Sequence, residues 1–377
     1  MRAANTRITK PGRCDEDIRK SHSYPKELRG EYSAALIGRM EAGVIFEDEL
    51  IDKIRELYPD DDSVVILEGG QDRKKWKEET LEALNDPKVR FLVNPSLPTA
   101  KVANLTGDPD FLIRTDEGYW VPVDAKNHRE YVGTSKKVIH YTSPLEDVWF
   151  ENKQVVQNAV GTPHQDDSVQ LAHYHVMLNE LGFGGGADRE AWGGIIGRSG
   201  DITWRRLDIP LSSTAKKTPL QIHAETYAHR EAIIDQEDKR LAGDRQALPL
   251  VSPAKNSLCG DCPWKKVCFA EMEAEDHPTL LPGVTAAAWE KLKQAGVTSR
   301  FKLAKLDHHT AKVMGAGVDI AALREILVEE DNDDRLLISV AAVKDADRKA
   351  LKAVGVETVG DIKNLDESTL AVGGPKN

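Results

Sequence analysis

The chain has 377 residues, of which 40% are hydrophobic and 30% charged, and its formal net charge is −11 at pH 7. This composition is typical of a globular protein with a sizeable core, and the length allows roughly two or three domains. No apolar run approaches the roughly 20 residues of a membrane helix, and the N-terminus lacks the apolar centre of a secretion signal. The acidic balance argues against a surface that coats nucleic acid broadly, but it is compatible with a local basic channel. We therefore expect a cytoplasmic protein with no membrane partner.

The first hundred residues predict two helices and a short strand. Residues 31 to 57 carry apolar side chains at rough helical spacing, and residues 73 to 86 predict a charged helix. Between them, the Ser-Val-Val-Ile-Leu run at residues 63 to 67 predicts a short buried strand. From residue 89 to 105 the pattern is mixed, and two prolines break any long element.

A β-hairpin is predicted next, and charged side chains gather at one end of it. Two runs of β-forming residues, 111 to 113 and 119 to 123, flank a Thr-Asp-Glu-Gly turn. Because side chains alternate along a strand, Asp124 and Lys126 share one face with the tryptophan and proline before them, about 7 Å apart at the backbone. The valines and the alanine between them form the expected core face. Asp110 opens the first strand and is expected at the same end.

Two carboxylates and an ammonium group in this arrangement suit a divalent-metal phosphodiesterase. Carboxylate oxygens hold Mg²⁺ while leaving positions for water and a phosphate oxygen. The metal activates the water and neutralises charge that develops on the phosphate, and a neighbouring lysine can orient that water or help to deprotonate it. A solvated hairpin with ordinary surface charges is the alternative, because D-x-K alone is a weak signal.

The segment after the hairpin predicts a loop-rich insertion followed by three regular elements. Residues 127 to 168 carry few regular signals. Residues 167 to 182 predict a helix that is capped by Asp167 or the serine after it. Residues 192 to 209 predict a second hairpin, and residues 218 to 243 predict a long helix.

The first hairpin resembles the central motif of the P-D-(D/E)-x-K nucleases. The Gly-Asp-Pro-Asp run that ends at Asp110 looks like their G-x-x-D, and the Val-Asp-Ala-Lys run that ends at Lys126 looks like their apolar-(D/E)-x-K. The resemblance implies that Asp110 and Asp124 bind the metal and that Lys126 is catalytic. Asp108 is a rival for the role of Asp110, because period two places both on one face.

Two further motifs resemble the RecB-like branch of these nucleases. The Arg-Met-Glu-Ala-Gly-Val-Ile-Phe-Glu run that ends at Glu47 looks like its first motif, in which a glycine precedes a metal-reaching histidine or glutamate. This implies a metal role for Glu47, with Glu41 as the second choice. Gln170 and Tyr174 share a helix face and look like Q-x-x-x-Y, whose residues line the site near DNA. Solvated or core-edge side chains are the alternative for each motif.

Only four cysteines occur in the chain, and three of them are clustered. Cys259, Cys262 and Cys268 form a C-x₂-C-x₅-C pattern, and Cys14 lies near the N-terminus. Four thiolates suffice for a [4Fe–4S] cluster, whereas disulfides are not expected in a cytoplasmic chain. A Cys₄ zinc site is the alternative, although structural zinc sites usually use two short pairs. The arrangement resembles the iron-staple nucleases, which implies a [4Fe–4S] cluster on all four cysteines.

The last hundred residues contain an internal repeat. Leu-Lys-Gln-Ala-Gly-Val at residues 292 to 297 matches Leu-Lys-Ala-Val-Gly-Val at residues 351 to 356, an offset of 59. The repeated unit resembles a helix-hairpin-helix, whose turns offer backbone amides to a DNA phosphate. The resemblance implies DNA contacts at Gly283, Val284 and Lys344. A purely structural helical module is the alternative.

These observations predict two domains and a function in DNA metabolism. We expect an α/β, restriction-endonuclease-like mixed sheet flanked by helices in residues 1 to 276, and an all-α helix-hairpin-helix domain in residues 277 to 377. The resemblance implies a Mg²⁺- or Mn²⁺-dependent deoxyribonuclease that hydrolyses phosphodiester bonds from ends or in single strands during DNA repair, recombination or processing. Its expected partners are DNA and a helicase or another repair protein. The alternatives are a catalytically inactive DNA-binding scaffold and a zinc-stabilised adaptor of a helicase or repair complex.

Overall fold

The protein is described by a computed structural model that divides into two units. The described residues are 4–5, 13–70, 72–102, 104–134, 138–157, 159–318 and 320. The larger unit comprises residues 1–27 and 31–251, and the smaller unit comprises residues 28–30 and 252–377. The domain boundary expected after residue 276 therefore lies inside the smaller unit. Among the described residues, no helix is both long and apolar enough to cross a membrane.

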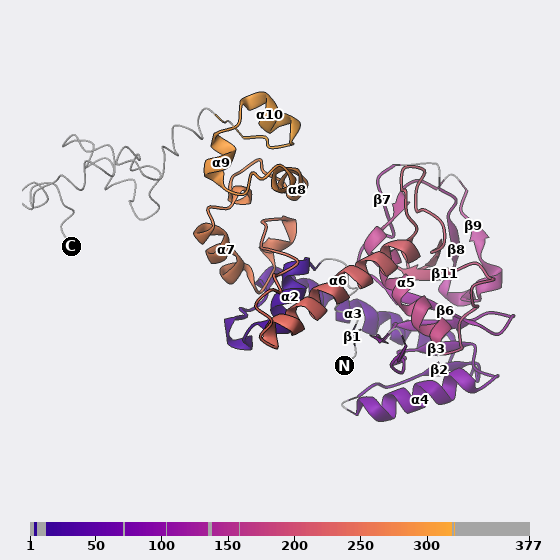
Figure 1. Ribbon diagram of the computed structural model, residues 1–377. Helices are drawn as coiled ribbons and strands as arrows, with labels where there is room; N and C mark the ends of the chain where they lie inside the picture. The colour runs from indigo at the N-terminus through magenta and orange to yellow at the C-terminus, as the bar shows by residue number, and fades with distance from the viewer. Residues whose placement is uncertain are drawn as a thin grey trace, which may run out of the picture. The chain divides into compact units, whose positions relative to one another are not determined.

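An eight-stranded mixed sheet forms the centre of the larger unit (Figure 1). In sheet order its strands are β2 (Val64–Ile66), β3 (Phe91–Val93), β5 (Phe111–Arg114), β6 (Trp120–Ala125), β11 (Trp192–Ile196), β12 (Ile202–Arg206), β8 (Tyr141–Ser143) and β9 (Gln154–Val155). The pairs β2–β3 and β6–β11 are parallel, and the other neighbours are antiparallel. The prediction of a mixed α/β fold with flanking helices is confirmed.

The remaining elements of the larger unit are helices and short pieces. The α-helices are α2 (Asp15–Ser23), α3 (Ala34–Leu57), α4 (Arg73–Asn85), α5 (Gln165–Glu180) and α6 (Pro219–Leu241). The short pieces are β1 (Ala4–Asn5), η1 (Lys26–Leu28, whose last residue belongs to the smaller unit), β4 (Leu105–Thr106), β7 (Tyr131–Val132), η2 (Leu145–Asp147), η3 (Phe150–Asn152) and β10 (Thr162–Pro163). Because β6 and β11 are parallel, the chain must cross over between them, and α5 makes this connection. Helix α6 then packs against both α5 and α2.

Both faces of the sheet are buried, and the central hairpin contributes to both cores. On one face, Leu112 and Trp120 share a buried cluster with Leu84 of α4 and Met177 of α5. On the opposite face, the valines of β6 share a cluster with the C-terminal part of α3 and with Phe150 of η3. Burying one such side chain stabilises the fold by about 1.5–3 kcal/mol.

The predicted hairpin is confirmed, but both of its faces are buried, whereas only the valine face was expected to be a core face. Strands β5 and β6 pair in antiparallel register from Phe111 opposite Val123 to Arg114 opposite Trp120. Gly118 supplies the left-handed residue of the turn, at φ +90°. Trp120, expected on the charged face, is only 1% exposed. The alternation rule assumes one solvated face, whereas helices cover both faces here.

The structure adds detail to three expectations about local structure. Residues 89 to 105, where the predicted pattern is mixed, contain β3, a fully buried strand too short to show a period. Helix α5 begins at Gln165 after His164 rather than at a cap formed by Asp167. In α3, Leu50 and Ile54 are the buried residues, so the apolar spacing in its first half does not mark a core face.

The smaller unit is helical in its described part. Its elements are η4 (Ser257–Gly260), α7 (Lys265–Ala274), η5 (Pro278–Leu280), α8 (Ala286–Gln294), α9 (Arg300–Ala304) and α10 (His308–Val313). Trp289 and Leu292 of α8 pack with Leu303 of α9 in one core. The second copy of the predicted repeat, with Lys344, lies outside the described residues.

Candidate active site

The three residues of the predicted catalytic motif meet where β6 ends. The Ala125 amide donates a hydrogen bond of 2.6 Å to Asp110 Oδ2, which ties the start of β5 to the end of β6. Asp124 is 1% exposed, and its carboxylate accepts a hydrogen bond from Lys126 Nζ. The Lys126 amide in turn donates to the Ile196 carbonyl of β11 at 2.9 Å. The hairpin and the parallel neighbour therefore fix all three positions.

Glu47 joins this group from α3. The loop after β6 is tied to α3, because Asn127 Nδ2 donates to the Ala42 carbonyl at 2.8 Å. Burial, followed by the negative charge of Asp124, raises the pKa of Glu47, which places the two carboxylates within electrostatic reach. Glu41, the second choice for this role, is exposed on the same helix.

The pKa values describe a crowded anionic site around one cation. Burial, followed by the charges of Asp124 and Glu47, raises the pKa of Asp110 well above its ordinary value, although Lys126 opposes this shift. For Lys126, burial by itself lowers the pKa, but Asp124 and Asp110 outweigh it and raise the pKa above its ordinary value. Lys126 is therefore protonated at neutral pH. Three carboxylates beside one ammonium group leave an excess of negative charge.

That excess of charge suits a divalent cation. Carboxylate oxygens are the ligands that Mg²⁺ and Mn²⁺ prefer, and a bound cation would relieve the repulsion that raises the pKa values of Asp110 and Glu47. Asp110, Asp124 and Glu47 are the residues that would hold it. Carboxylate is the donor type that the predicted metal needs, but among the described residues the oxygen atoms of these three side chains do not all lie within 4.8 Å of one another, so the metal site stays a prediction.

Asp108, the rival of Asp110, is engaged elsewhere. Its carboxylate accepts hydrogen bonds from Arg73 Nη2 at 2.5 Å and from Ser96 Oγ at 2.7 Å. Both partners hold the side chain toward the start of α4. This geometry favours Asp110 as the metal ligand.

Gln170 and Tyr174 form a hydrogen-bonded pair that reaches the same region. Gln170 Nε2 donates to the Tyr174 hydroxyl at 2.9 Å, and that hydroxyl donates to the Asp108 carbonyl at 3.1 Å. Burial, followed by the charges of Asp124 and Asp110, raises the pKa of Tyr174. Tyr174 is only 3% exposed, so its position suits holding the backbone before Asp110.

A second group of polar side chains lies beside this site and has no place in the nuclease motifs. One ring nitrogen of His128, one of His164 and a carboxylate oxygen of Asp167 all lie within 4.8 Å of one another. His128 follows Lys126 by two positions, and His164 and Asp167 are three apart at the start of α5. The H-x-x-D spacing is the only sequence signal for this group, because the approach of His128 depends on the path of the loop.

The four cysteines are divided between the two units. Cys14 caps α2 by accepting a hydrogen bond from the Asp17 amide at 3.4 Å. In the smaller unit, Cys259 Sγ accepts one from the Asn256 amide at 3.4 Å, and Cys268 is buried in α7. All four cysteines lie among the described residues, and none of them forms a disulfide. Among the described residues, no three cysteine sulfur atoms lie within 4.8 Å of one another, so the [4Fe–4S] cluster stays a prediction.

Backbone groups of the predicted DNA-contacting turn form hydrogen bonds within the protein. Gly283 has φ +89°, and its carbonyl accepts a hydrogen bond from the Gly317 amide at 2.9 Å. The Val284 amide donates to the Leu281 carbonyl at 3.3 Å, and its side chain is 6% exposed. The hydrogen bond of Val284 competes with the phosphate contact that the sequence predicts for it.

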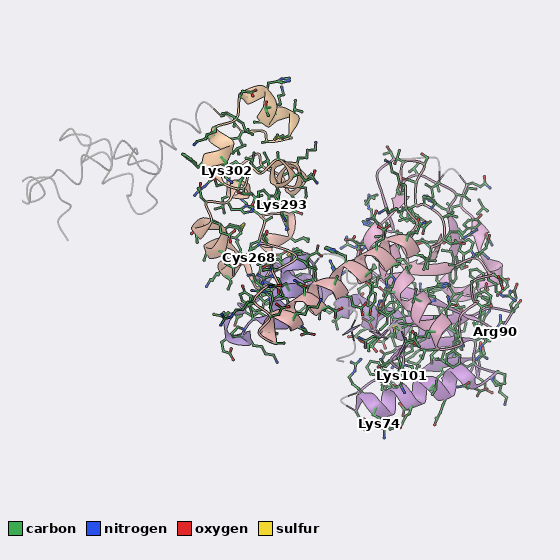
Figure 2. The ribbon with its side chains drawn as sticks, viewed as in Figure 1. Lys74, Arg90, Lys101, Cys268, Lys293 and Lys302 are labelled. Atoms are coloured by element: carbon green, nitrogen blue, oxygen red, sulfur yellow. The ribbon has the colours of Figure 1, made fainter. Side chains whose placement is uncertain are left out.

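The segment after this turn is rich in basic side chains, of which Arg300 forms an ion pair with Asp276. Between residues 285 and 313 the chain has six lysines and arginines against two acidic residues. Lys293 of α8 and Lys302 of α9 are exposed members of this group (Figure 2). The smaller unit therefore offers a local basic surface on an acidic chain.

Comparisons of the chain with protein-family models, with curated proteins and with solved structures gave no match.

Proposed function

We propose that the protein is a metal-dependent deoxyribonuclease of the RecB-like P-D-(D/E)-x-K type, with a restriction-endonuclease-like core. The observation that carries the proposal is the meeting of Asp110, Asp124 and Lys126 at the end of β6, with Glu47 of α3 within electrostatic reach. These residues come from a helix and from both strands of a hairpin, and their charges act on one another. The bond between Gln170 and Tyr174 supports the same assignment from α5.

In this proposal each residue of the site has a separate task. Bound Mg²⁺ or Mn²⁺ supplies an activated water and neutralises charge on the phosphate. Asp110, Asp124 and Glu47 would hold the metal, and the hydrogen bond from the Ala125 amide fixes the Asp110 carboxylate. Because Lys126 is protonated, it serves as a donor that orients water or neutralises phosphate oxygen, and it does not take up a proton.

The proposal also gives the smaller unit and the cysteines a role. The basic surface around α8 and α9 would add affinity for the DNA backbone without reading sequence. The four thiols would bind a [4Fe–4S] cluster that staples the N-terminus to residues 259–268, with zinc as the alternative metal. Both roles support DNA processing and leave the chemistry to the larger unit.

The experiment is a cleavage assay on end-labelled single- and double-stranded DNA, with Mg²⁺, Mn²⁺ or EDTA. We expect metal-dependent cleavage by the wild type and losses on the order of a hundredfold or more for Asp124→Asn and Lys126→Met. Asp108→Asn is the matched control, because it removes a nearby carboxylate that Arg73 and Ser96 already occupy. Near wild-type cleavage by Asp124→Asn would refute the proposal. Metal-dependent DNA binding by the wild type without cleavage would instead favour an inactive scaffold.

A further inference from the structure

The group formed by His128, His164 and Asp167 has donor atoms at the separation expected around a metal ion. His128 Nε2 lies 3.5 Å from Asp167 Oδ1. Two ligands of a tetrahedral Zn²⁺ ion, each about 2.0–2.1 Å from the metal, lie about 3.4 Å apart. One donor atom from each residue lies within 4.8 Å of the other two, so small side-chain rotations would bring the third into range.

A single backbone carbonyl fixes the tautomers of both histidines. His128 Nδ1 lies 2.8 Å from the Arg129 carbonyl oxygen, and His164 Nε2 lies 2.9 Å from the same atom. A carbonyl oxygen can only accept, so these two nitrogens carry the protons. The neutral rings therefore keep lone pairs on His128 Nε2 and His164 Nδ1. Metal-binding histidines are commonly oriented through such a hydrogen bond to the second nitrogen.

The carboxylate of the group is oriented by an arginine on its other side. Arg205 Nη1 lies 3.5 Å from Asp167 Oδ2, while Oδ1 is the oxygen nearer His128. The Arg205 side chain is buried and also donates to the Glu130 carbonyl at 2.8 Å. This arrangement leaves one carboxylate oxygen directed at the histidines.

The two imidazole rings also argue against a simple ion-pair explanation. Their centroids are 4.4 Å apart, so protonation of both rings would place two positive charges in contact. A single imidazolium–carboxylate pair would explain His128 and Asp167, but it would not explain why the second ring turns its protonated nitrogen to the same carbonyl. A metal ion bound by the second nitrogen of each ring is compatible with both orientations.

We propose that His128, His164 and Asp167 bind a divalent transition-metal ion of the Zn²⁺ class, at a site distinct from the carboxylates of Asp110 and Asp124. Imidazole nitrogen suits such ions better than Mg²⁺. The side chain of His128 is 40% exposed, so one side of the site is open to solvent. Three protein ligands with an open position are typical of zinc sites that also bind water or substrate.

The test measures Zn²⁺ binding to the full-length protein by titration calorimetry in excess Mg²⁺, which occupies the carboxylates of the proposed active site. Zinc bound by the cysteines is common to all variants, so the difference between variants reports this site. We expect His128→Ala and His164→Ala to lose one equivalent of Zn²⁺ or to bind it at least tenfold more weakly. His309→Ala, which removes an exposed histidine of α10, is the matched control and should bind like the wild type.

Co²⁺ gives a second readout, because its visible spectrum reports ligand geometry while thiolate ligation adds charge-transfer bands at shorter wavelength. We expect His128→Ala to remove visible intensity and to leave the thiolate bands unchanged. His128 is partly exposed, so this variant should fold, and its melting temperature in EDTA should equal that of the wild type. Unchanged zinc stoichiometry and affinity in both histidine variants would overturn the inference. The result does not depend on cleavage, so failure of the nuclease proposal would leave it standing.

Discussion

Replacing Asp110 by asparagine should stabilise the metal-free protein and abolish its stabilisation by metal. The raised pKa of Asp110 means that burial and the charges of Asp124 and Glu47 disfavour its ionised form in the folded protein. Each unit of such a shift corresponds to about 1.4 kcal/mol of lost stability above both pKa values. Asparagine removes the charge but keeps an oxygen that can accept the hydrogen bond from Ala125. We expect a gain on the order of 1 kcal/mol in EDTA at pH 7.5, which corresponds to about 2–4 °C in melting temperature.

The pH dependence of this difference has a definite sign. A carboxyl group whose pKa is raised by folding binds more protons in the folded state, so its penalty is full above the folded pKa. The penalty disappears as the pH falls below the unfolded value of about 3.9. The advantage of Asp110→Asn over the wild type should therefore shrink as the pH is lowered from 7.5 toward 4.

Metal should make the wild type more stable than Asp110→Asn, which reverses their order in EDTA. A cation at a hundred times its dissociation constant stabilises the wild type by about 2.7 kcal/mol, whereas the variant lacks a ligand and should gain little. Thermal melts in EDTA and in Mn²⁺ test both statements. Asp108→Asn is the control, because losing a partly exposed ion pair costs at most about 1 kcal/mol and leaves the metal response intact. A destabilised Asp110→Asn protein that responds to Mn²⁺ like the wild type would refute the reasoning.

Three further predictions test other parts of the molecule. His173 and His223 are buried neighbours, and burial lowers their pKa values to about 4 and about 3. The stability of the protein should therefore fall as the pH drops below about 6.5, by about 2 kcal/mol for each histidine at pH 5. Urea titrations at pH 7.5 and 5 measure this, and an equal loss in His223→Gln would contradict it. Cys14→Ser should lose iron and the visible absorbance of the cluster, with stability lowered by about 4 kcal/mol by analogy with long-loop cross-links; full iron content in the variant would exclude the staple. Lys293→Glu with Lys302→Glu should weaken DNA binding and flatten its salt dependence while saturating DNA restores cleavage, and unchanged binding at low salt would assign the DNA surface elsewhere.

The hairpin could be predicted from the sequence because its information is local. Alternating β-formers and a glycine turn lie within twenty residues of one another, and they also place Asp124 beside Lys126. Asp110 could be expected at the same end once the hairpin was drawn. Its choice over Asp108 could not, because that depends on Arg73 and Ser96 occupying the rival carboxylate.

Other features depend on tertiary packing that local patterns do not record. Trp120 is buried because helices cover both faces of the sheet, and no alternation within β6 can show this. The place of Glu47 depends on how α3 crosses the end of the hairpin. The histidine–aspartate group needs the segment of 37 residues from His128 to His164 to fold back on its own start. The pairing of β7 with β10 brings the end of this segment back to its start, and both strands are too short to be predicted from the sequence.

The hydrogen bond from Ala125 to Asp110 makes the geometry of the site depend on the register of β5 against β6. If β5 slipped by two residues against β6, side chains would keep their faces, and the hydrophobic pattern alone would penalise the error weakly. Asp110, however, would lose its amide partner and leave the neighbourhood of Asp124. A cation that binds only the native register would therefore stabilise that register over the slipped ones. Metal in the refolding buffer should raise the yield of the native hairpin as well as its stability.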